Sequence, residues 1–237
     1  MDVYYRDVER HRRMDALYAA FLNAGDLAFD VGSHVGDRTA CFRRLGARVV
    51  ACEPQLTCRT LLASLFFNDP DVAIVPDVVG PKAGTATFHI NSANPTVSTA
   101  ASDFVAAADG ADGWAEQTWD RSEEVTVTTL DALIAEHGAP RFIKIDVEGF
   151  EADVLAGLSQ KVPALSFEFT TIQRDVAHRC LEQLASLAPY RFNMAIGETQ
   201  VLAAEAWMTA DGMAAEIDRL DDSINSGDIY ARLDDTQ

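Results

Sequence analysis

The sequence predicts an α/β fold in which a parallel sheet is covered by helices on both faces. Short apolar runs alternate with stretches of helical periodicity along most of the 237 residues. Repeated strand, helix, strand order favours parallel pairing through right-handed crossovers. The composition, with 48% hydrophobic and 24% charged residues, is that of an ordinary globular protein. We therefore expect one domain that spans residues 1–237.

The first part of the chain is expected to hold an N-terminal helix and two strand–helix units. Residues 1–25 are interpreted as the N-terminal helical segment, with apolar side chains at helical spacing from residue 8 to residue 24. The elements predicted after it are a strand at 27–31, a helix at 37–45, a strand at 48–54, a helix at 56–67 and a strand at 72–79.

The alternation of strands and helices is interrupted in the middle of the chain. The apolar alternation at 86–90 is either a hairpin arm or an edge extension, and residues 91–124 contain Asn-Pro and Asp-Gly turn signals with two tryptophans, Trp114 and Trp119. We interpret 91–124 as an insertion that could close over an acceptor as a lid. The later predicted elements are strands at 125–130, 142–147, 164–170, 191–196 and 228–233, and helices ending near 138 and covering 150–158, 172–187 and about 205–220.

The charge and the N-terminal sequence bear on partners and location. The chain has 19 Lys and Arg against 37 Asp and Glu, a net charge of −18. A field of this sign repels phosphate backbones and anionic lipid, so we expect neither nucleic acid nor a membrane surface as a partner. The N-terminal sequence has no signal-peptide-like apolar block, and no run is long enough to span a membrane. We therefore expect a cytoplasmic protein.

A glycine-containing turn follows the first predicted strand. It reads DVGSHVGD, where Gly32 permits a sharp turn and Gly36 lets a ligand approach the start of the next helix. The GxxxG spacing differs from the GxGxxG pattern that a dinucleotide pyrophosphate favours, and Asp30 suits an ammonium group better than a pyrophosphate. Glu53 ends the next strand, where an acid can accept both hydroxyls of a ribose.

These features together favour S-adenosylmethionine as the ligand over NAD. The alternative is an ordinary strand–helix turn followed by a surface glutamate. Asp77 could face the adenine amino group or be a turn residue, and His34 could contact the ligand or cap the helix. The candidate cofactor-binding residues are Asp30, Gly32, Ser33, His34, Gly36, Asp37, Thr39, Glu53, Asp77, Val78 and Asp146.

A second candidate site lies at the ends of two later strands. The run FIKIDVEGFE places charged side chains in an otherwise apolar strand, and Glu168 lies between two phenylalanines of the next strand. Buried charges are costly unless they are paired or used. The candidate catalytic residues are Asp146, Glu148, Glu168, His34 and Lys144.

Three interpretations of this second site remain open. Lys144 and a carboxylate could form a structural pair, or Asp146 or Glu148 could act as a general base. Asp146 and Glu168 could instead hold Mg²⁺, which prefers oxygen ligands, with Asn193 or His34 as a third ligand. We place acid–base work slightly ahead of metal binding because the sequence identifies no third ligand with certainty.

The chain resembles the FkbM-type family of S-adenosylmethionine-dependent methyltransferases. The resemblance covers roughly residues 26–170 and depends on FDVGSHVGDRT, VVACEP, TLDAL, IKIDVEGFEADVLAGL and SFEFT. It implies a Rossmann-like, seven-stranded sheet whose last strand is antiparallel. It also implies cofactor roles for Asp30, Gly32, Gly36, Glu53 and Asp146. His34 departs from the family, which commonly has a small amide at this position.

The expected function is therefore methylation of a hydroxyl group, with a saccharide or sugar-containing metabolite as the acceptor. Trp114 and Trp119 could stack on a sugar ring or anchor the insertion. We expect a small-molecule or oligosaccharide partner, and the sequence leaves a homodimer open. The alternatives are a nicotinamide-dependent oxidoreductase and a non-catalytic protein that binds an adenosine ligand.

Overall fold

The computed structural model describes residues 7–234. Residues 1–6, which belong to the predicted N-terminal helical segment, and residues 235–237 lie outside the described residues. None of the helices within the described range is long and apolar enough to cross a membrane.

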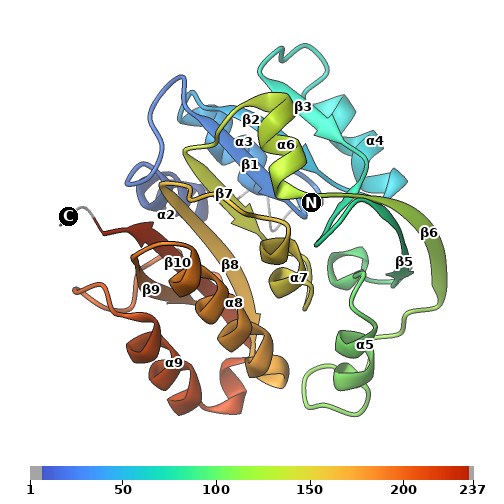
Figure 1. Ribbon diagram of the computed structural model, residues 1–237. Helices are drawn as coiled ribbons and strands as arrows, with labels where there is room; N and C mark the ends of the chain where they lie inside the picture. The colour runs from blue at the N-terminus through green and yellow to red at the C-terminus, as the bar shows by residue number, and fades with distance from the viewer. Residues whose placement is uncertain (1–6, 235–237) are drawn as a thin grey trace.

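A seven-stranded sheet forms the centre of the molecule (Figure 1). Its strands are β1 (Leu27–Val31), β2 (Arg48–Cys52), β3 (Val72–Val75), β7 (Phe142–Ile145), β8 (Ala164–Thr170), β9 (Tyr190–Ile196) and β10 (Ser226–Leu233). They lie in the order β3-β2-β1-β7-β8-β10-β9, and β10 runs antiparallel to both of its neighbours. The predicted sheet, including its antiparallel last strand, is confirmed.

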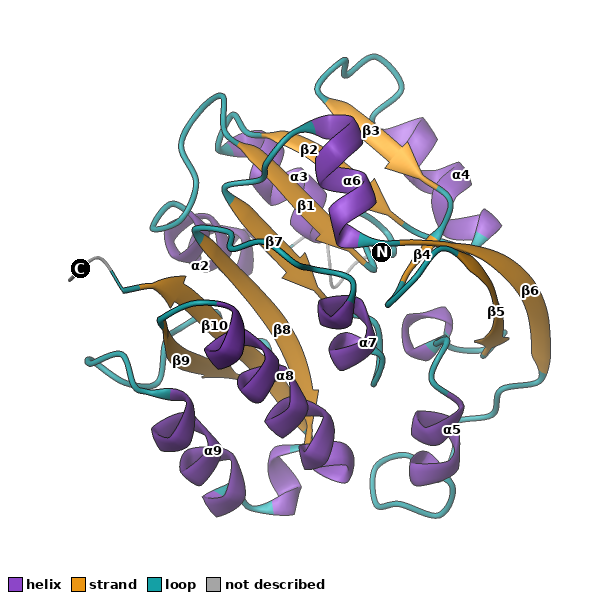
Figure 2. Ribbon diagram, in the orientation of Figure 1, coloured by secondary structure: helices purple, strands orange, loops and turns teal. Residues whose placement is uncertain are grey.

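Helices cover both faces of this sheet, as predicted (Figure 2). The helices are α2 (Val8–Tyr18), α3 (Asp37–Arg44), α4 (Leu56–Leu65), α5 (Ser102–Ala108), α6 (Leu130–His137), α7 (Glu151–Ala156), α8 (Arg174–Leu187) and α9 (Ala210–Arg219). Apolar side chains of α6, α7, α8 and α9 share one hydrophobic core with the sheet, and side chains of α2 and α3 share a second. Each helix buries one apolar stripe, which is the pattern that helical periodicity predicts.

A small second sheet corrects the predicted boundaries. It consists of β4 (Val78–Val79), β5 (Gly84–Ile90) and β6 (Arg121–Thr128), in the order β4-β6-β5. The predicted strand at 72–79 is therefore two strands, because Pro76 lacks the N–H that a continuing ladder needs. The segment at 86–90 belongs to a hairpin arm, β5, which pairs antiparallel with β6.

Three further boundaries also differ from the predictions. β6 begins at Arg121, so the expected insertion 91–124 ends at residue 120. The charged start of β6 is exposed and hides the alternation of a strand. The first helix ends at Tyr18 rather than near residue 24, and α9 covers only Ala210–Arg219.

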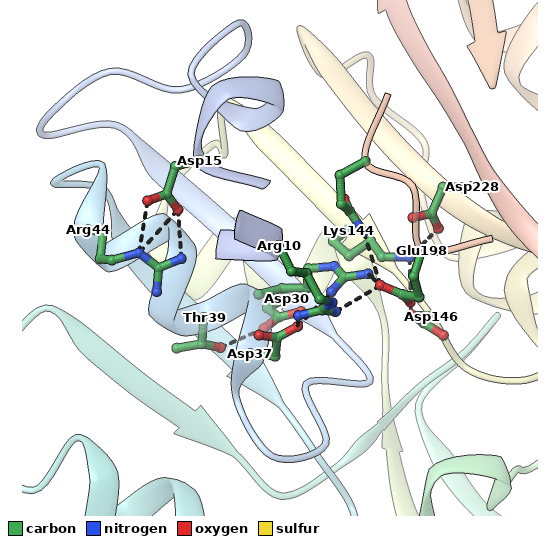
Figure 3. Close-up of polar contacts among 12 residues, drawn as sticks. Arg10, Asp15, Asp30, Asp37, Thr39, Arg44, Lys144, Asp146, Glu198 and Asp228 are labelled. Atoms are coloured by element: carbon green, nitrogen blue, oxygen red, sulfur yellow. Dashed lines mark hydrogen bonds and ion pairs between the residues drawn. The ribbon is translucent and has the colours of Figure 1, made fainter. Parts of the chain in front are cut away.

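A buried ion pair connects β7 with the antiparallel strand β10. Lys144 is fully buried, and its Nζ lies 2.5 Å from Asp228 Oδ1 and 3.1 Å from Asp146 Oδ2 (Figure 3). Burial by itself lowers the pKa of Lys144, but the two carboxylates hold it well above its ordinary value. A buried ammonium group therefore keeps its charge because two strands supply partners.

We expect the substitution Asp228→Asn to lower the free energy of unfolding by about 3 kcal/mol. This is the lower end of the range for breaking a buried pair, because Asp146 still faces Lys144. Urea denaturation measures the loss. The control is Asp15→Asn, which removes the partly exposed pair of Asp15 with Arg44 and should cost about 1 kcal/mol or less. Equal losses in the two variants would contradict the interpretation.

Candidate functional site

The site forms where the strand order reverses, between the carboxyl ends of β1 and β7. Gly32 follows β1 with a φ of +81°, and a Cβ atom there would lie 1.8 Å from the carbonyl oxygen of Asp146. The N–H groups of Gly32 and Ser33 each donate to Cys52 O at 3.0 Å. Only glycine allows the turn after β1 to pack this closely on the end of β7. Such a switch point is where ligands bind in open α/β sheets.

Two neighbouring cavities open at this point. The first, here named the β1–β2 cavity, has a volume of about 480 Å³. Its polar lining includes Gly32, His34, Glu53, Asp77 and Asp146. Its apolar lining includes Val31, Val78, Val79, Phe88 and Phe150. An apolar slot with a few converging polar groups is typical of a small-molecule site.

Glu53 is held firmly at the wall of the β1–β2 cavity. It is 2% exposed, and its two carboxylate oxygens accept the N–H groups of His34 and Gln55 at 2.8 Å each. Burial raises the pKa of Glu53 to about 7, and these two hydrogen bonds partly oppose the shift. Each oxygen retains a second lone pair, so the carboxylate can accept further hydrogen bonds from a ligand.

Asp77 and Val78 also line the β1–β2 cavity. Asp77 lies between β3 and β4, and Val78 is the first residue of β4. The Thr126 hydroxyl donates to Asp77 Oδ1, which orients this carboxyl group. Asp30 and Thr39, in contrast, line neither cavity. Thr39 Oγ1 donates to Asp30 Oδ2 at 2.5 Å, and Asp30 Oδ1 has no hydrogen-bond partner among the described residues. Burial raises the pKa of Asp30 to about 6.

The second cavity, named the β7–β8 cavity, has a volume of about 560 Å³. It shares Gly32, His34, Thr96 and Asp146 with the first cavity. Its other lining residues are Ser33, Val35, Asp37, Arg38, Glu148, Glu168 and Glu198. Asp146 therefore stands at the boundary between an apolar cavity and a strongly acidic one. Gly36, at φ 82°, forms the N-cap of α3 beside this wall.

Three carboxyl groups converge in the β7–β8 cavity. Asp146, Glu148 and Glu168 each offer an oxygen that lies within 4.8 Å of the others. Burial, reinforced by the Asp146 charge, raises the pKa values of Glu148 and Glu168 well above the ordinary range. Both glutamates therefore retain a proton more readily than an exposed glutamate does. Lys144 lies behind them, paired with Asp146 and outside the lining of both cavities.

An ion-pair network that sequence reasoning missed forms another part of the β7–β8 wall. Asp37 Oδ2 lies 2.7 Å from both Arg10 Nη1 and Arg38 Nη1, and Glu198 faces the same two guanidinium groups (Figure 3). Arg10 belongs to α2, and Glu198 follows β9. The Asp37 carboxylate thus forms ion pairs with two arginines. The sequence signal was weak, because Arg10 and Glu198 lie far from Asp37 and Arg38 in the chain.

Asn193, one of the two residues considered as a third metal ligand, is occupied elsewhere in the fold. Its side-chain amide donates to Ala204 O at 2.7 Å and accepts from Ala204 N and Met194 N, so it is fully used in the fold. His34 also does not join the cluster, although it lines both cavities. Burial lowers the pKa of His34. The third acidic side chain beside Asp146 and Glu168 is Glu148.

The predicted insertion contributes to the site through its first half. Thr96, Ser98 and Ala100 line the β1–β2 cavity. The two tryptophans anchor the segment, because Trp114 Nε1 donates to Asn225 and Trp119 Nε1 donates to Val97 O. Both rings also pack edge-on against Phe104. Of the two roles expected for these rings, the structure favours anchoring over stacking on a ligand.

One protein family matches most of the chain. The family model described as "Methyltransferase FkbM domain" matches residues 30–220. No curated protein matches the chain.

Among solved structures, a precorrin-6y C5,15-methyltransferase from Geobacter metallireducens GS-15 has a TM-score of 0.48 and 10% identity, covering 95% of this chain and 88% of that chain. An O-methyltransferase from Bacillus cereus in complex with S-adenosylhomocysteine has a TM-score of 0.47 and 12% identity, covering 96% and 82%. An rRNA methylase from Streptococcus thermophilus has a TM-score of 0.45 and 11% identity, covering 93% and 94%.

We expect the substitution Gly32→Ala to destabilise the fold far more than Gly25→Ala. Both glycines have φ values above +80°, so both variants carry the backbone strain of about 1–2 kcal/mol. A Cβ at Gly25 meets nothing within 4 Å, whereas at Gly32 it meets the backbone of Asp146. Thermal and urea unfolding of the two variants measure the difference. A Gly32 variant that is as stable as the Gly25 variant would show that the close packing is unnecessary.

Proposed function

The chain belongs to the FkbM methyltransferase family, and from this premise we propose that it methylates a hydroxyl of a saccharide or sugar-containing metabolite. As a member of that family, it is an S-adenosylmethionine-dependent methyltransferase. The observation that carries the proposal is the pair of cavities that meet at Asp146. One has the features of a nucleoside site, and the other is lined by carboxyl groups.

The residues of the β1–β2 cavity fit this cofactor. We assign the ribose hydroxyls to Glu53, whose oxygens have spare lone pairs, and the adenine amino group to Asp77. Val78 would form part of the apolar slot for the adenine ring. The glycines of the turn, Gly32 and Gly36, allow close approach of the backbone.

The structure changes the role that we propose for Asp30. Its carboxyl group lies behind the cavity walls and hydrogen-bonds Thr39, so it would act as a positioning residue for the start of α3. Asp146, whose side chain is 32% exposed, is the carboxylate within reach of the cationic part of the cofactor. Ser33 and His34 would complete this end of the site.

The remaining chemistry is removal of a proton from the acceptor. When bound, S-adenosylmethionine supplies a methyl group that an acceptor oxygen can take by in-line displacement. The acceptor hydroxyl loses one proton in the reaction, and Glu148 or Glu168 could hold it, because burial raises both pKa values. A Mg²⁺ ion bound by the same carboxylates would be the alternative means of activating the hydroxyl.

A hydroxyl-rich acceptor suits the β7–β8 cavity. Carboxyl oxygens accept hydrogen bonds, so Asp146, Glu148 and Glu168 complement a ligand that donates several. The net charge of −18 disfavours nucleic acid as the acceptor. We propose that the segment 91–120, which contributes Thr96 to both cavities, serves as a lid over the acceptor.

The family membership also decides between the alternatives. It replaces the nicotinamide-dependent oxidoreductase, whose GxGxxG pattern the chain lacks. A non-catalytic protein that only binds an adenosine ligand differs from a methyltransferase in one measurable respect, turnover. It would bind S-adenosylhomocysteine and transfer nothing to any acceptor.

Methyl transfer can be followed with S-adenosylmethionine that carries a ¹³C-labelled methyl group. Panels of glycosides, other alcohols, amines and RNA serve as acceptors, and NMR distinguishes a new methoxy carbon from N- and C-methyl products. We expect methoxy signals on glycosides. Transfer to amines, carbon or RNA alone would contradict the proposed acceptor class, and cofactor binding without any transfer would favour the non-catalytic alternative.

The affinity for S-adenosylhomocysteine should rise with pH near neutrality because of Glu53. Its pKa of about 7 in the folded protein lies above the ordinary value of 4.5, so the carboxyl group is still partly protonated near pH 7. Ribose hydroxyls donate better to the ionised group, and binding should therefore release a proton. In the free protein the sign is opposite: stability from this group falls as pH rises from about 4.5 through 7.

Calorimetry across this pH range, in buffers of different ionisation enthalpy, measures the effect. Glu53→Gln should weaken binding by about 1–3 kcal/mol above pH 7, the scale of a hydrogen bond to a charged group. It should also remove the Glu53 part of the proton release. Asp77→Asn leaves Glu53 intact and should retain that proton release. A Glu53→Gln variant with unchanged affinity and pH dependence would exclude Glu53 from the cofactor site.

A further inference from the structure

We propose that Asp146, Glu148 and Glu168 bind a divalent cation of the Mg²⁺ type, with Glu148 as the third protein ligand. The inference rests on the proposed function only for the role of the ion, because the site itself follows from the geometry of the cluster. Mg²⁺ and similar hard cations prefer carboxylate oxygens and keep several positions for water or substrate.

The spacing of the oxygens suits one ion. The three ligand atoms lie within 4.8 Å of one another. Opposite oxygens around Mg²⁺ lie about 4 Å apart, so small side-chain movements would complete the coordination. Three different parts of the backbone supply the ligands: the residue after β7, the loop that follows it, and the end of β8.

Two of the carboxyl groups have unused oxygens aimed into the cluster. Glu148 is only 7% exposed, and none of the hydrogen bonds among residues 7–234 involves its carboxylate. Glu168 Oε2 is likewise buried without a partner within the described chain. Buried polar atoms normally find a partner, and such exceptions call for an explanation. A bound cation would satisfy the buried Glu168 Oε2 and give the Glu148 carboxylate a partner.

The loop after β7 fixes Glu148 in this position. Thr99 Oγ1 donates to the carbonyl of Glu148 at 2.8 Å, and Glu151 Oε1 accepts the N–H groups of Val147 and Gly149 at 3.1 and 3.3 Å. Gly149 allows the tight turn, because a Cβ there would lie 2.6 Å from Gln173 Oε1. The carboxylate is therefore presented by a well-supported backbone.

The protein places little positive charge beside the cluster. Lys144 supplies one positive charge, but it also pairs with Asp228. The two nearby arginines are already paired with Asp37 and Glu198. A divalent cation would allow all three carboxyl groups to ionise without any rearrangement of these pairs.

The position of the ion would define the acceptor more narrowly. Asp146 lines both cavities, so an ion on it would lie where the acceptor hydroxyl meets the methyl donor. Three protein ligands leave open positions that two neighbouring hydroxyls of one molecule can fill. The acceptor class that fits is thus a saccharide with adjacent hydroxyl groups, and the ion would favour ionisation of the one that is methylated.

Binding of Mn²⁺, followed by electron paramagnetic resonance with Mg²⁺ as competitor, tests the site without any turnover. We expect one competable ion per chain in the wild-type protein, and at least about tenfold weaker binding in Glu148→Gln and Glu168→Gln. Asp153→Asn is the control, because Asp153 is an acid near Asp103 outside the cluster. It should bind the ion as the wild type does.

Thermal unfolding provides a second measurement that a purely structural role would not reproduce. Mg²⁺ should raise the Tm of the wild type and of Asp153→Asn but not that of Glu168→Gln. In EDTA, Glu168→Gln should be at least as stable as the wild type, because glutamine is neutral without binding a proton beside the other two carboxyl groups. Undetectable Mn²⁺ binding, or equal binding in the wild type and Glu168→Gln, would overturn the proposal.

The same samples separate this proposal from methyl transfer itself. Full transfer to a glycoside in EDTA would overturn the role of the ion and leave the methyltransferase assignment intact. Specific Mn²⁺ binding at the cluster without transfer to any hydroxyl would support the site and overturn the proposed function.

Discussion

The close approach of two backbone segments underlies the whole site. Gly32, at the end of β1, packs directly on the carbonyl of Asp146, at the end of β7. These strands are neighbours in the sheet although more than a hundred residues of chain separate them. Because the contact admits no side chain, the turn that leads to α3 and the loop that carries the carboxylates are fixed relative to each other. Both cavities take part of their walls from this junction.

The strands of the central sheet could be predicted from the sequence because its inner strands are almost wholly buried. Strands such as LAFDV and FIKI are apolar runs between helical stretches, and the buried pattern of β1 and β7 agrees with this. The strand boundaries of the small sheet could not be predicted in the same way. Its strand β6 begins with exposed, charged residues, and β4 is only two residues long after Pro76. Its pairing depends on a partner strand rather than on a periodic pattern.

The candidate site shows the same division between local and long-range information. Polar residues at strand ends, such as Glu53 and Asp146, could be placed from the strand pattern, since carboxyl ends of parallel strands meet at one edge. The network of Arg10, Asp37 and Glu198 could not, because its members come from distant segments. Glu148 as a third member of the cluster depends on a left-handed backbone at φ 55°, which its residue type does not indicate.

The buried pair of Lys144 and Asp228 has a consequence for the order in which the protein can be made. Lys144 leaves the ribosome 84 residues before its partner. Until β10 has been synthesised, β7 can take its place beside β1 only by burying an ammonium group with half of its compensation missing. The parallel half of the sheet therefore gains stability when β10 pairs, because Lys144 has Asp146 alone as its partner until then. The strand synthesised last thus supplies both the second partner of Lys144 and the ladder that joins β8 to β9.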